Sequence, residues 1–187
     1  MIKKWFISIV AVLFMTSMAE ARNVSGKNIP ETMKAGDHSL LLSGVGIRKK
    51  MWLLIYAAGL YLPEKMNDAQ KIINADKPMA IKIHVISGLM SAKKMENALR
   101  EGFEKSTNGN LSPIKDRMEK FIAAQTTEVN TDDVFEYVYI PKEGVSVFFK
   151  GKLVTTVKGL DFKKAVFGIW LGKDAGDKNL KKGLLNN

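Results

Sequence analysis

Residues 44–65 read GVGIRKKMWLLIYAAGLYLPEK, and their composition is the clearest indication of the fold. Two apolar runs rich in Leu, Ile, Val and Tyr meet at a basic turn, which is typical of adjoining β-strands, here His38 to Arg48 and Met51 to Leu62. Gly44 and Gly46 form a G-x-G pair, but the third glycine and the following helix of a dinucleotide site are missing. We expect instead that these glycines let another backbone or a ligand come close to the strand.

Blocks of strands and blocks of helices follow along the chain. Further runs with strand composition are Met79–Ser87, Val134–Ile140, Val145–Lys150 and Lys152–Lys158, the last two joined by a tight turn at Gly151. Runs with helical spacing are Ser91–Ser106, Ser112–Gln125, Asp161–Leu171, Asp177–Leu185 and, more weakly, Asn67–Asn74. Such segregated blocks predict an α+β fold, with a mostly antiparallel large sheet and helices on one face. The other face is either solvated or folded over to leave a groove.

The N-terminus has the composition of an export signal. Two lysines precede an uncharged apolar run, residues 5–15, and Ala19-Glu20-Ala21 offers small residues for cleavage. The run is about half of the ~20 residues that span a bilayer and is followed directly by the cleavage site, both of which disfavour the alternative, a retained N-terminal anchor. We expect a cleaved signal peptide at residues 1–21, a single domain at 22–187 without a transmembrane segment, and a periplasmic location.

Composition excludes several classes of site. The chain has no cysteine and two histidines, His38 and His84, which excludes thiol catalysis, iron–sulfur clusters and zinc–thiolate sites. The net charge is +10, but the lysines are scattered in pairs and no nucleic-acid-binding motif accompanies them. Because hydrolase-elbow, zinc-protease and P-loop motifs are also absent, we expect no metal, no cofactor and no nucleic acid.

Arg48 is the strongest candidate for binding chemistry. It ends the apolar strand that begins at His38, and a guanidinium is permanently charged and binds carboxylates in a planar two-point geometry. The alternative is a strand-end arginine that faces water. Tyr56 and Tyr61 follow in the next strand, where phenols are either ligand contacts or core residues with one hydrogen-bond partner.

At these residues the sequence resembles the chalcone isomerase-like family, in its bacterial exported branch. The glycine-rich strand ending in Arg48, the YAAGLYL strand after it, and the segments SAKKMENALREGFEK and FKKAVFGIWLGKDAGDKNLKKGLL are all similar to that family, in the same order. The resemblance extends from about Gly36 to Leu185. It implies an open-faced β-sandwich with a ligand cleft between the large sheet and the helices. Members of the family either cyclise chalcones without a cofactor or bind fatty acids through an arginine and a tyrosine.

The resemblance also implies roles for individual residues. Arg48 matches the arginine that contacts the ligand's anionic oxygen in both branches, and Tyr56 matches the fatty-acid-binding branch, where the isomerases have a threonine. Met90 stands where the isomerases place an active-site tyrosine. Asn97 matches their asparagine, although helical spacing puts it on the charged face, opposite the apolar stripe.

Three hypotheses for function remain open. The first is an exported, non-catalytic protein that binds a small hydrophobic, fatty-acid-like carboxylate in a cleft through Arg48 and Tyr56, with Tyr61, Met90 and Asn97 as further contacts. The second is a cofactor-independent isomerase of the chalcone–flavanone type that uses Arg48, Tyr56 and Asn97. The third is an envelope interaction protein without a small ligand, whose protein partner the sequence does not identify. Losing one oxyanion donor costs about 10²–10³ in rate, which makes Met90 unfavourable for the isomerase.

Overall fold

A computed structural model of the protein describes residues 21–88, 91–125 and 128–187. Within these residues, seven antiparallel strands form one sheet in chain order. They are β3 (Thr32–Ala35), β4 (His38–Lys50), β5 (Leu53–Leu62), β6 (Met79–Val85), β7 (Val134–Ile140), β8 (Gly144–Phe149) and β9 (Lys152–Val157). A separate hairpin of β1 (Ala21–Val24) and β2 (Lys27–Pro30) precedes them. The α+β prediction is confirmed.

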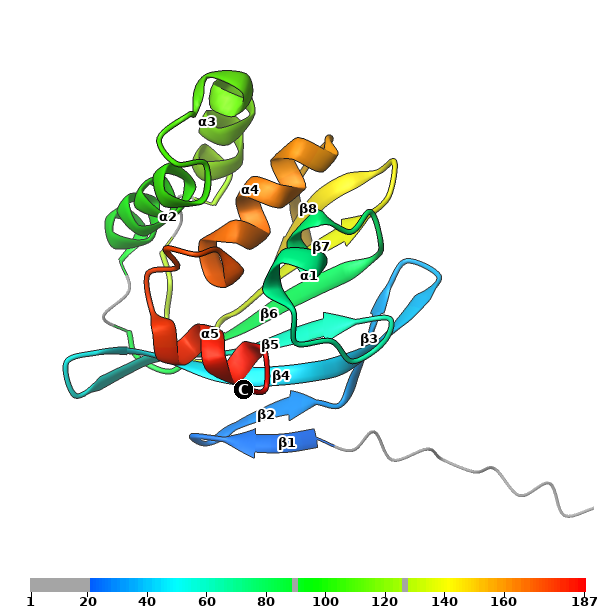
Figure 1. Ribbon diagram of the computed structural model, residues 1–187. Helices are drawn as coiled ribbons and strands as arrows, with labels where there is room; N and C mark the ends of the chain where they lie inside the picture. The colour runs from blue at the N-terminus through cyan, green and yellow to red at the C-terminus, as the bar shows by residue number, and fades with distance from the viewer. Residues whose placement is uncertain (1–20, 89–90, 126–127) are drawn as a thin grey trace, which may run out of the picture.

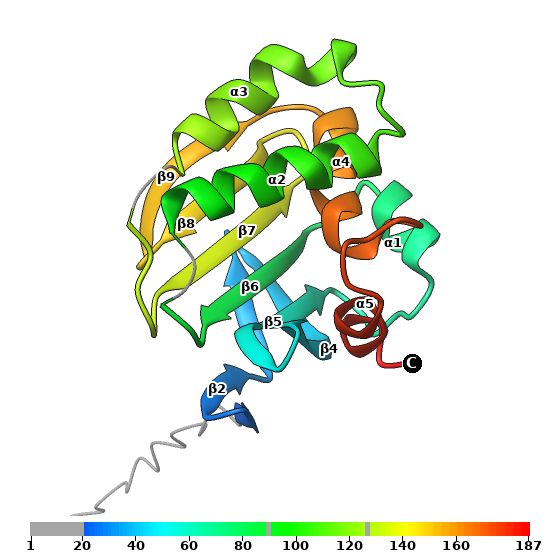
Figure 2. The ribbon, with the colours of Figure 1, turned by 90° about the vertical axis from the view of Figure 1, so that its left-hand side faces the viewer.

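The helices lie on one face of the sheet (Figure 1). They are α1 (Ala69–Asn74), α2 (Ala92–Ser106), α3 (Lys115–Ala123), α4 (Leu160–Leu171) and α5 (Lys178–Leu184). Side-chain oxygens of Asp68, Ser91 and Asp177 accept backbone N–H hydrogen bonds at the starts of α1, α2 and α5. The run predicted from Ser112 begins as a 3₁₀ turn, Ser112–Ile114, before α3. Figure 2 shows α2, α3 and α4 grouped together and α5 apart from them, beside β4.

The main core fills the space between the sheet and the helices. Its centre is aromatic: the rings of Phe103, Phe121 and Phe162 have centroids 5.3 to 5.8 Å apart. Lys163 is also fully buried, and its Nζ donates to three backbone carbonyls at the end of α1, at 2.8 to 2.9 Å. This lysine therefore ties α4 to α1, as the N–H donors of a cap would.

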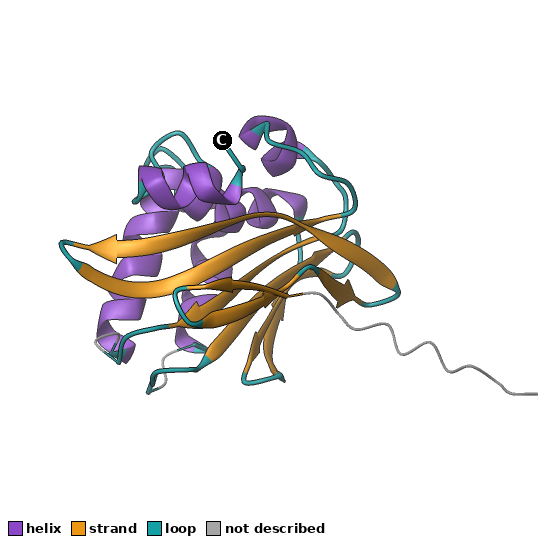
Figure 3. Cartoon of the chain, turned by 90° about the horizontal axis from the view of Figure 1, so that it is seen from below, coloured by secondary structure: helices purple, strands orange, loops and turns teal. Residues whose placement is uncertain are grey.

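The opposite face of the sheet is folded over rather than open. The β1–β2 hairpin and the curled β3–β4 segment lie against it (Figure 3). A second, smaller apolar cluster packs there, with Ile29 of β2, Leu40 of β4 and Tyr61 of β5 all fully buried. The strands β1, β2 and β3 were not predicted, because they are short and lack an apolar alternation. Met51 and Trp52, predicted to start a strand, form the turn between β4 and β5 instead.

Candidate functional site

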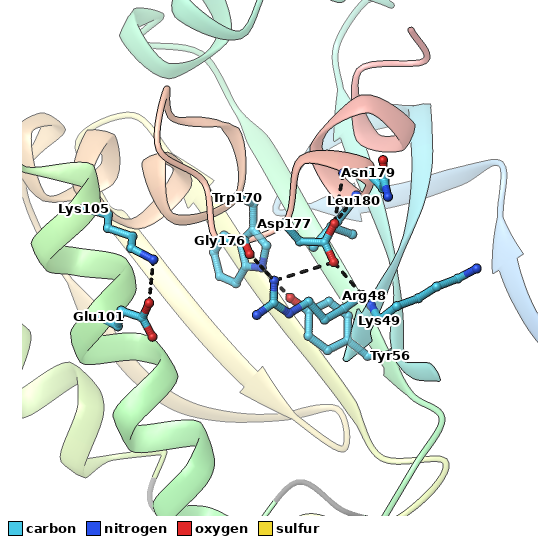
Figure 4. A network of polar contacts seen from close by, with 10 residues as sticks. All are labelled: Arg48, Lys49, Tyr56, Glu101, Lys105, Trp170, Gly176, Asp177, Asn179 and Leu180. Carbon is cyan, nitrogen blue, oxygen red and sulfur yellow. Dashed lines mark hydrogen bonds and ion pairs between the residues drawn. The ribbon is translucent and has the colours of Figure 1, made fainter. Parts of the chain in front are cut away.

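Arg48 and Tyr56 are direct cross-strand neighbours on β4 and β5. Residues paired in this way project from the same face of a sheet, and Figure 4 shows both side chains between α2 and the segment that leads into α5. Tyr56 packs against the main core, and its oxygen accepts a hydrogen bond from Trp170 Nε1 at 3.2 Å. Burial raises the pKa of Tyr56 above 10, so the phenol stays neutral. Because the indole is the donor, the Tyr56 hydroxyl keeps its own hydrogen for a further acceptor.

The Arg48 guanidinium is held by the C-terminal part of the chain. Its Nη1 donates to the Gly176 carbonyl at 2.6 Å and lies 3.6 Å from Asp177 Oδ2 (Figure 4). About a third of the side chain, 34%, is exposed. Glu101 of α2 lies near enough for the Arg48 charge to contribute to lowering its pKa, after the larger effect of its bond to Lys105. Arg48 is therefore a partly exposed cation whose partners, the Gly176 carbonyl and the Asp177 carboxylate, belong to the chain itself.

Asp177 connects this contact to the start of α5. Its Oδ1 accepts the backbone N–H groups of Asn179 and Leu180, both at 2.9 Å, and its Oδ2 accepts the N–H of Lys49 at 3.3 Å. One carboxylate thus caps a helix, pairs with Arg48 and bonds the adjacent strand. An anion bound at Arg48 would compete with this carboxylate.

Glycines in β4 let α5 pack directly on this strand. The sequence predicts that Gly44 and Gly46 let another backbone or a ligand come close, and the partner is the backbone of α5. A Cβ at Gly44 would lie 2.5 Å from the Gly183 carbonyl oxygen, and one at Gly46 would lie 2.8 Å from Leu180 Cδ1 and collide with the Leu180 carbonyl oxygen. A Cβ atom cannot come this close to a non-bonded heavy atom, so only glycine allows α5 to pack here. Gly44, Gly46 and Arg48 alternate along β4 and thus share one face. The same contact therefore brings Gly176 to Arg48.

A second polar pair lies deeper, between the sheet and α3. The Tyr137 hydroxyl donates to Gln125 Oε1 at 2.8 Å, and Gln125 Nε2 donates to the Phe121 carbonyl at 2.8 Å. The Tyr137 ring centroid is 4.9 Å from that of Trp170, and burial raises the pKa of this phenol too. Sequence reasoning did not select Tyr137, Gln125 or Trp170. A glutamine at the end of an amphipathic helix, after Phe121 and Ile122, was the available signal.

The other predicted contacts do not join Arg48. Tyr61 lies in the second apolar cluster, where its hydroxyl donates to the Pro30 carbonyl at 2.9 Å. It is five residues from Tyr56 in the same strand, and an odd separation puts two side chains on opposite faces. Asn97 is exposed on α2, as the helical spacing indicated. Met90 lies outside the described residues.

A groove of about 420 Å³ lies away from this pair, between α1, the end of α2 and α4. Its lining includes Asn74, Lys105, Thr107 and Lys164, but neither Arg48 nor Tyr56. In the described ranges, no group of three or more His, Asp or Glu side chains is placed to hold a metal ion. None of the described helices has the length and apolar character needed to cross a bilayer.

Comparison with known families matches residues 21–186 to the chalcone isomerase-like family, and the chain belongs to that family. The fold is also similar to the crystal structure of a fatty-acid binding protein from Arabidopsis thaliana, with a TM-score of 0.71 and 19% sequence identity. That similarity covers 87% of this chain and 93% of the plant protein. No match was found among curated proteins.

Proposed function

We propose that the protein is an exported, non-catalytic binding protein for a small hydrophobic carboxylate of the fatty-acid type. The observation that carries this proposal is the Arg48–Tyr56 pair, a cation and a neutral phenol side by side on the helix-covered face of the sheet. The family membership and the similar fold of a plant fatty-acid binding protein support it.

The chemistry of recognition follows from the partners that each group now has. A ligand carboxylate replaces the Gly176 carbonyl and the Asp177 carboxylate at the guanidinium and takes a hydrogen bond from Tyr56. Hydrogen bonds to a charged group contribute about 1.5–3 kcal/mol, which corresponds to roughly 10- to 150-fold in affinity. The neutral form of Tyr56 matters here, since a phenolate would repel the carboxylate.

The apolar tail lies against the main core beside Trp170, the residue that bonds Tyr56, in space that opens when the segment before α5 moves. Trp170 is 5% exposed and belongs to the same cluster as Leu99 of α2 and Leu180 of α5. Each methylene buried there adds about 0.8 kcal/mol. Since Gly176 and Asp177 close the site at Arg48, entry requires that the segment before α5 moves away from the strand.

The location is part of the same proposal. Residues 1–21 carry the charge and hydropathy pattern of a cleaved signal peptide, which would deliver the domain to the periplasm. N-terminal sequencing of protein from fractionated cells tests this. We expect a periplasmic form that begins at Arg22, whereas an intact N-terminus in the cytoplasm would contradict export.

Binding is tested by displacement of a fluorescent dansyl fatty acid from delipidated protein, with palmitate and hexadecanol as competitors. We expect Arg48→Gln to weaken palmitate binding roughly 10- to 150-fold and to leave hexadecanol binding nearly unchanged. Tyr56→Phe should weaken palmitate binding roughly 2- to 10-fold, through one neutral hydrogen bond. Asp177→Asn, which keeps the capping oxygen but removes the competing charge, should tighten it.

Lys49→Gln is the matched control, since it removes the same charge from the neighbouring, exposed position. Circular dichroism of each variant separates lost binding from lost folding. Equal palmitate affinities of the Arg48→Gln and Lys49→Gln variants, or equal affinities for palmitate and hexadecanol, would contradict the proposal. Protein-dependent decay of chalcone absorbance above the spontaneous rate would overturn the non-catalytic assignment.

A further inference from the structure

The end of the β4–β5 hairpin projects from the body of the protein. Pairing of β5 with β6 begins at Tyr56, so residues 49–54 form a two-stranded ribbon beyond the edge of the larger sheet. The hairpin, cyan in Figure 1, reaches past the helices there, and its orange strands reach past the rest of the sheet in Figure 3. We call residues 49–53 the hairpin tip.

The hairpin tip is apolar and exposed. Met51, Trp52 and Leu53 are consecutive, and they are 79%, 77% and 38% exposed. Met51 is the first of the two turn residues and has a φ of 56°, a conformation that favours glycine. The other two-residue hairpins, at Ser25-Gly26, Gly36-Asp37 and Lys150-Gly151, each have a glycine with positive φ and a polar residue in the turn. At this tip the turn consists of a methionine and a tryptophan instead, both largely exposed.

The charge around the hairpin tip has one sign. The sequence contains no Asp or Glu between Asp37 and Glu64, while Lys49 and Lys50 flank the exposed apolar residues. Asp177, which accepts the Lys49 N–H, is also paired with Arg48. An apolar wedge with a tryptophan and adjacent lysines complements an anionic lipid surface, where indole rings prefer the interface and lysines meet the headgroups.

We propose that the hairpin tip docks the protein on the surface of a bilayer that contains anionic phospholipid. A second copy of the chain is a poor occupant, because two such tips would bring four lysines together. A protein groove is also disfavoured, since stable interfaces bury about 800 Å² per partner and a ribbon tip of a few side chains supplies much less. The proposal does not depend on fatty-acid binding, although docking would place Arg48 close to the lipid.

The absence of cysteine from the sequence allows a direct test. Met51→Cys gives a single thiol that can be labelled with the environment-sensitive dye NBD. Leu153→Cys is the matched control, because Leu153 is also an exposed apolar residue, at 59%, in β9. The labelled proteins are mixed with vesicles of phosphatidylcholine alone, or with 30% phosphatidylglycerol, some carrying a lipid-bound nitroxide quencher. All variants share one N-terminus, so residues 1–20 contribute equally.

On anionic vesicles we expect the emission of NBD at position 51 to shift to shorter wavelength and to be quenched by the nitroxide. NBD at position 153 should stay in water and show neither change. Lys49→Gln and Lys50→Gln should each lower the partition coefficient roughly five-fold, and Trp52→Ser roughly ten-fold or more. High salt should remove the lysine contribution. Three results would each overturn the proposal. They are equal NBD responses at positions 51 and 153, binding that does not depend on phosphatidylglycerol, and an emission shift at position 51 without vesicles, caused by self-association.

Discussion

Replacing Gly46 by alanine tests the packing of α5 on β4, the contact that positions the candidate site. The new methyl group would lie 2.8 Å from Leu180 Cδ1 and would collide with the Leu180 carbonyl, so α5 has to shift by about an ångström. The helix buries Leu180, Leu184 and Leu185, each less than 5% exposed. Full exposure of one such leucine costs about 2 kcal/mol. Partial loss from all three predicts a destabilisation of about 2–4 kcal/mol, which lowers Tm by roughly 5–15 °C.

Urea unfolding followed by circular dichroism measures this change. Gly88→Ala is the matched control, because its Cβ would meet Thr131 Oγ1 at 3.6 Å, an ordinary contact. Without a clash, alanine reduces the freedom of the unfolded chain and should be neutral or stabilising by up to about 1 kcal/mol. Hydrogen exchange should be faster in residues 178–184 of the Gly46→Ala variant. A Gly46→Ala protein as stable as the Gly88→Ala protein would refute the reasoning.

Two further predictions concern buried polar groups. Burial lowers the pKa of His84 from 6.5 to about 4, and its Nε2 has no hydrogen-bond partner among the described residues. As the pH falls, the unfolded chain therefore binds a proton at His84 before the folded protein does. The free energy of unfolding should fall by about 1–2 kcal/mol, allowing for partial exposure, as the pH drops from about 6.5 to 4. His84→Gln should flatten that part of the pH profile, whereas His38→Gln, at an exposed position, should not. Gln125→Leu should lower the free energy of unfolding in urea by about 1–3 kcal/mol, because the buried Tyr137 hydroxyl loses its hydrogen-bond acceptor. Adding Tyr137→Phe should restore part of that loss. Strictly additive effects of the two substitutions would show that the hydrogen bond is not made.

Local periodicity was sufficient for most of the secondary structure. The helix from Ala92 begins one residue after the start of the predicted run, and Ser91 caps it by accepting the Lys94 N–H at 3.3 Å. The tight turn predicted at Gly151 is confirmed, as a two-residue turn of Lys150 and Gly151. By contrast, β1 to β3 consist of four residues each with mixed polarity, and a strand of this kind is defined by its pairing rather than by its own pattern.

The candidate site was only half predictable for a related reason. The pairing of Arg48 with Tyr56 was implied by the family resemblance alone, because a turn at residues 49–50, as predicted, would not have placed the two side by side. The chain turns at Met51-Trp52 instead, and the register shifts between Arg48 and Lys49. The groups that hold Arg48, by contrast, are Gly176 and Asp177, which lie 128 and 129 positions away along the chain. Neither residue carries a periodic or motif signal that points to Arg48. The two-residue period alone would have separated Tyr61 from Tyr56.

The segment before α5 couples ligand binding to stability. Asp177 caps the helix and pairs with Arg48, while Gly44 and Gly46 hold the helix against β4. A carboxylate that binds Arg48 therefore gains only the difference between its own contacts and those that it displaces. If the proposed function holds, Gly46→Ala loosens α5 and weakens the internal contacts of Arg48. The ligand affinity should then rise, while the domain becomes less stable. If Asp177 competes with the ligand for Arg48, the ligand affinity should rise while the stability falls. If Arg48 serves the fold alone, the affinity and the stability should both fall.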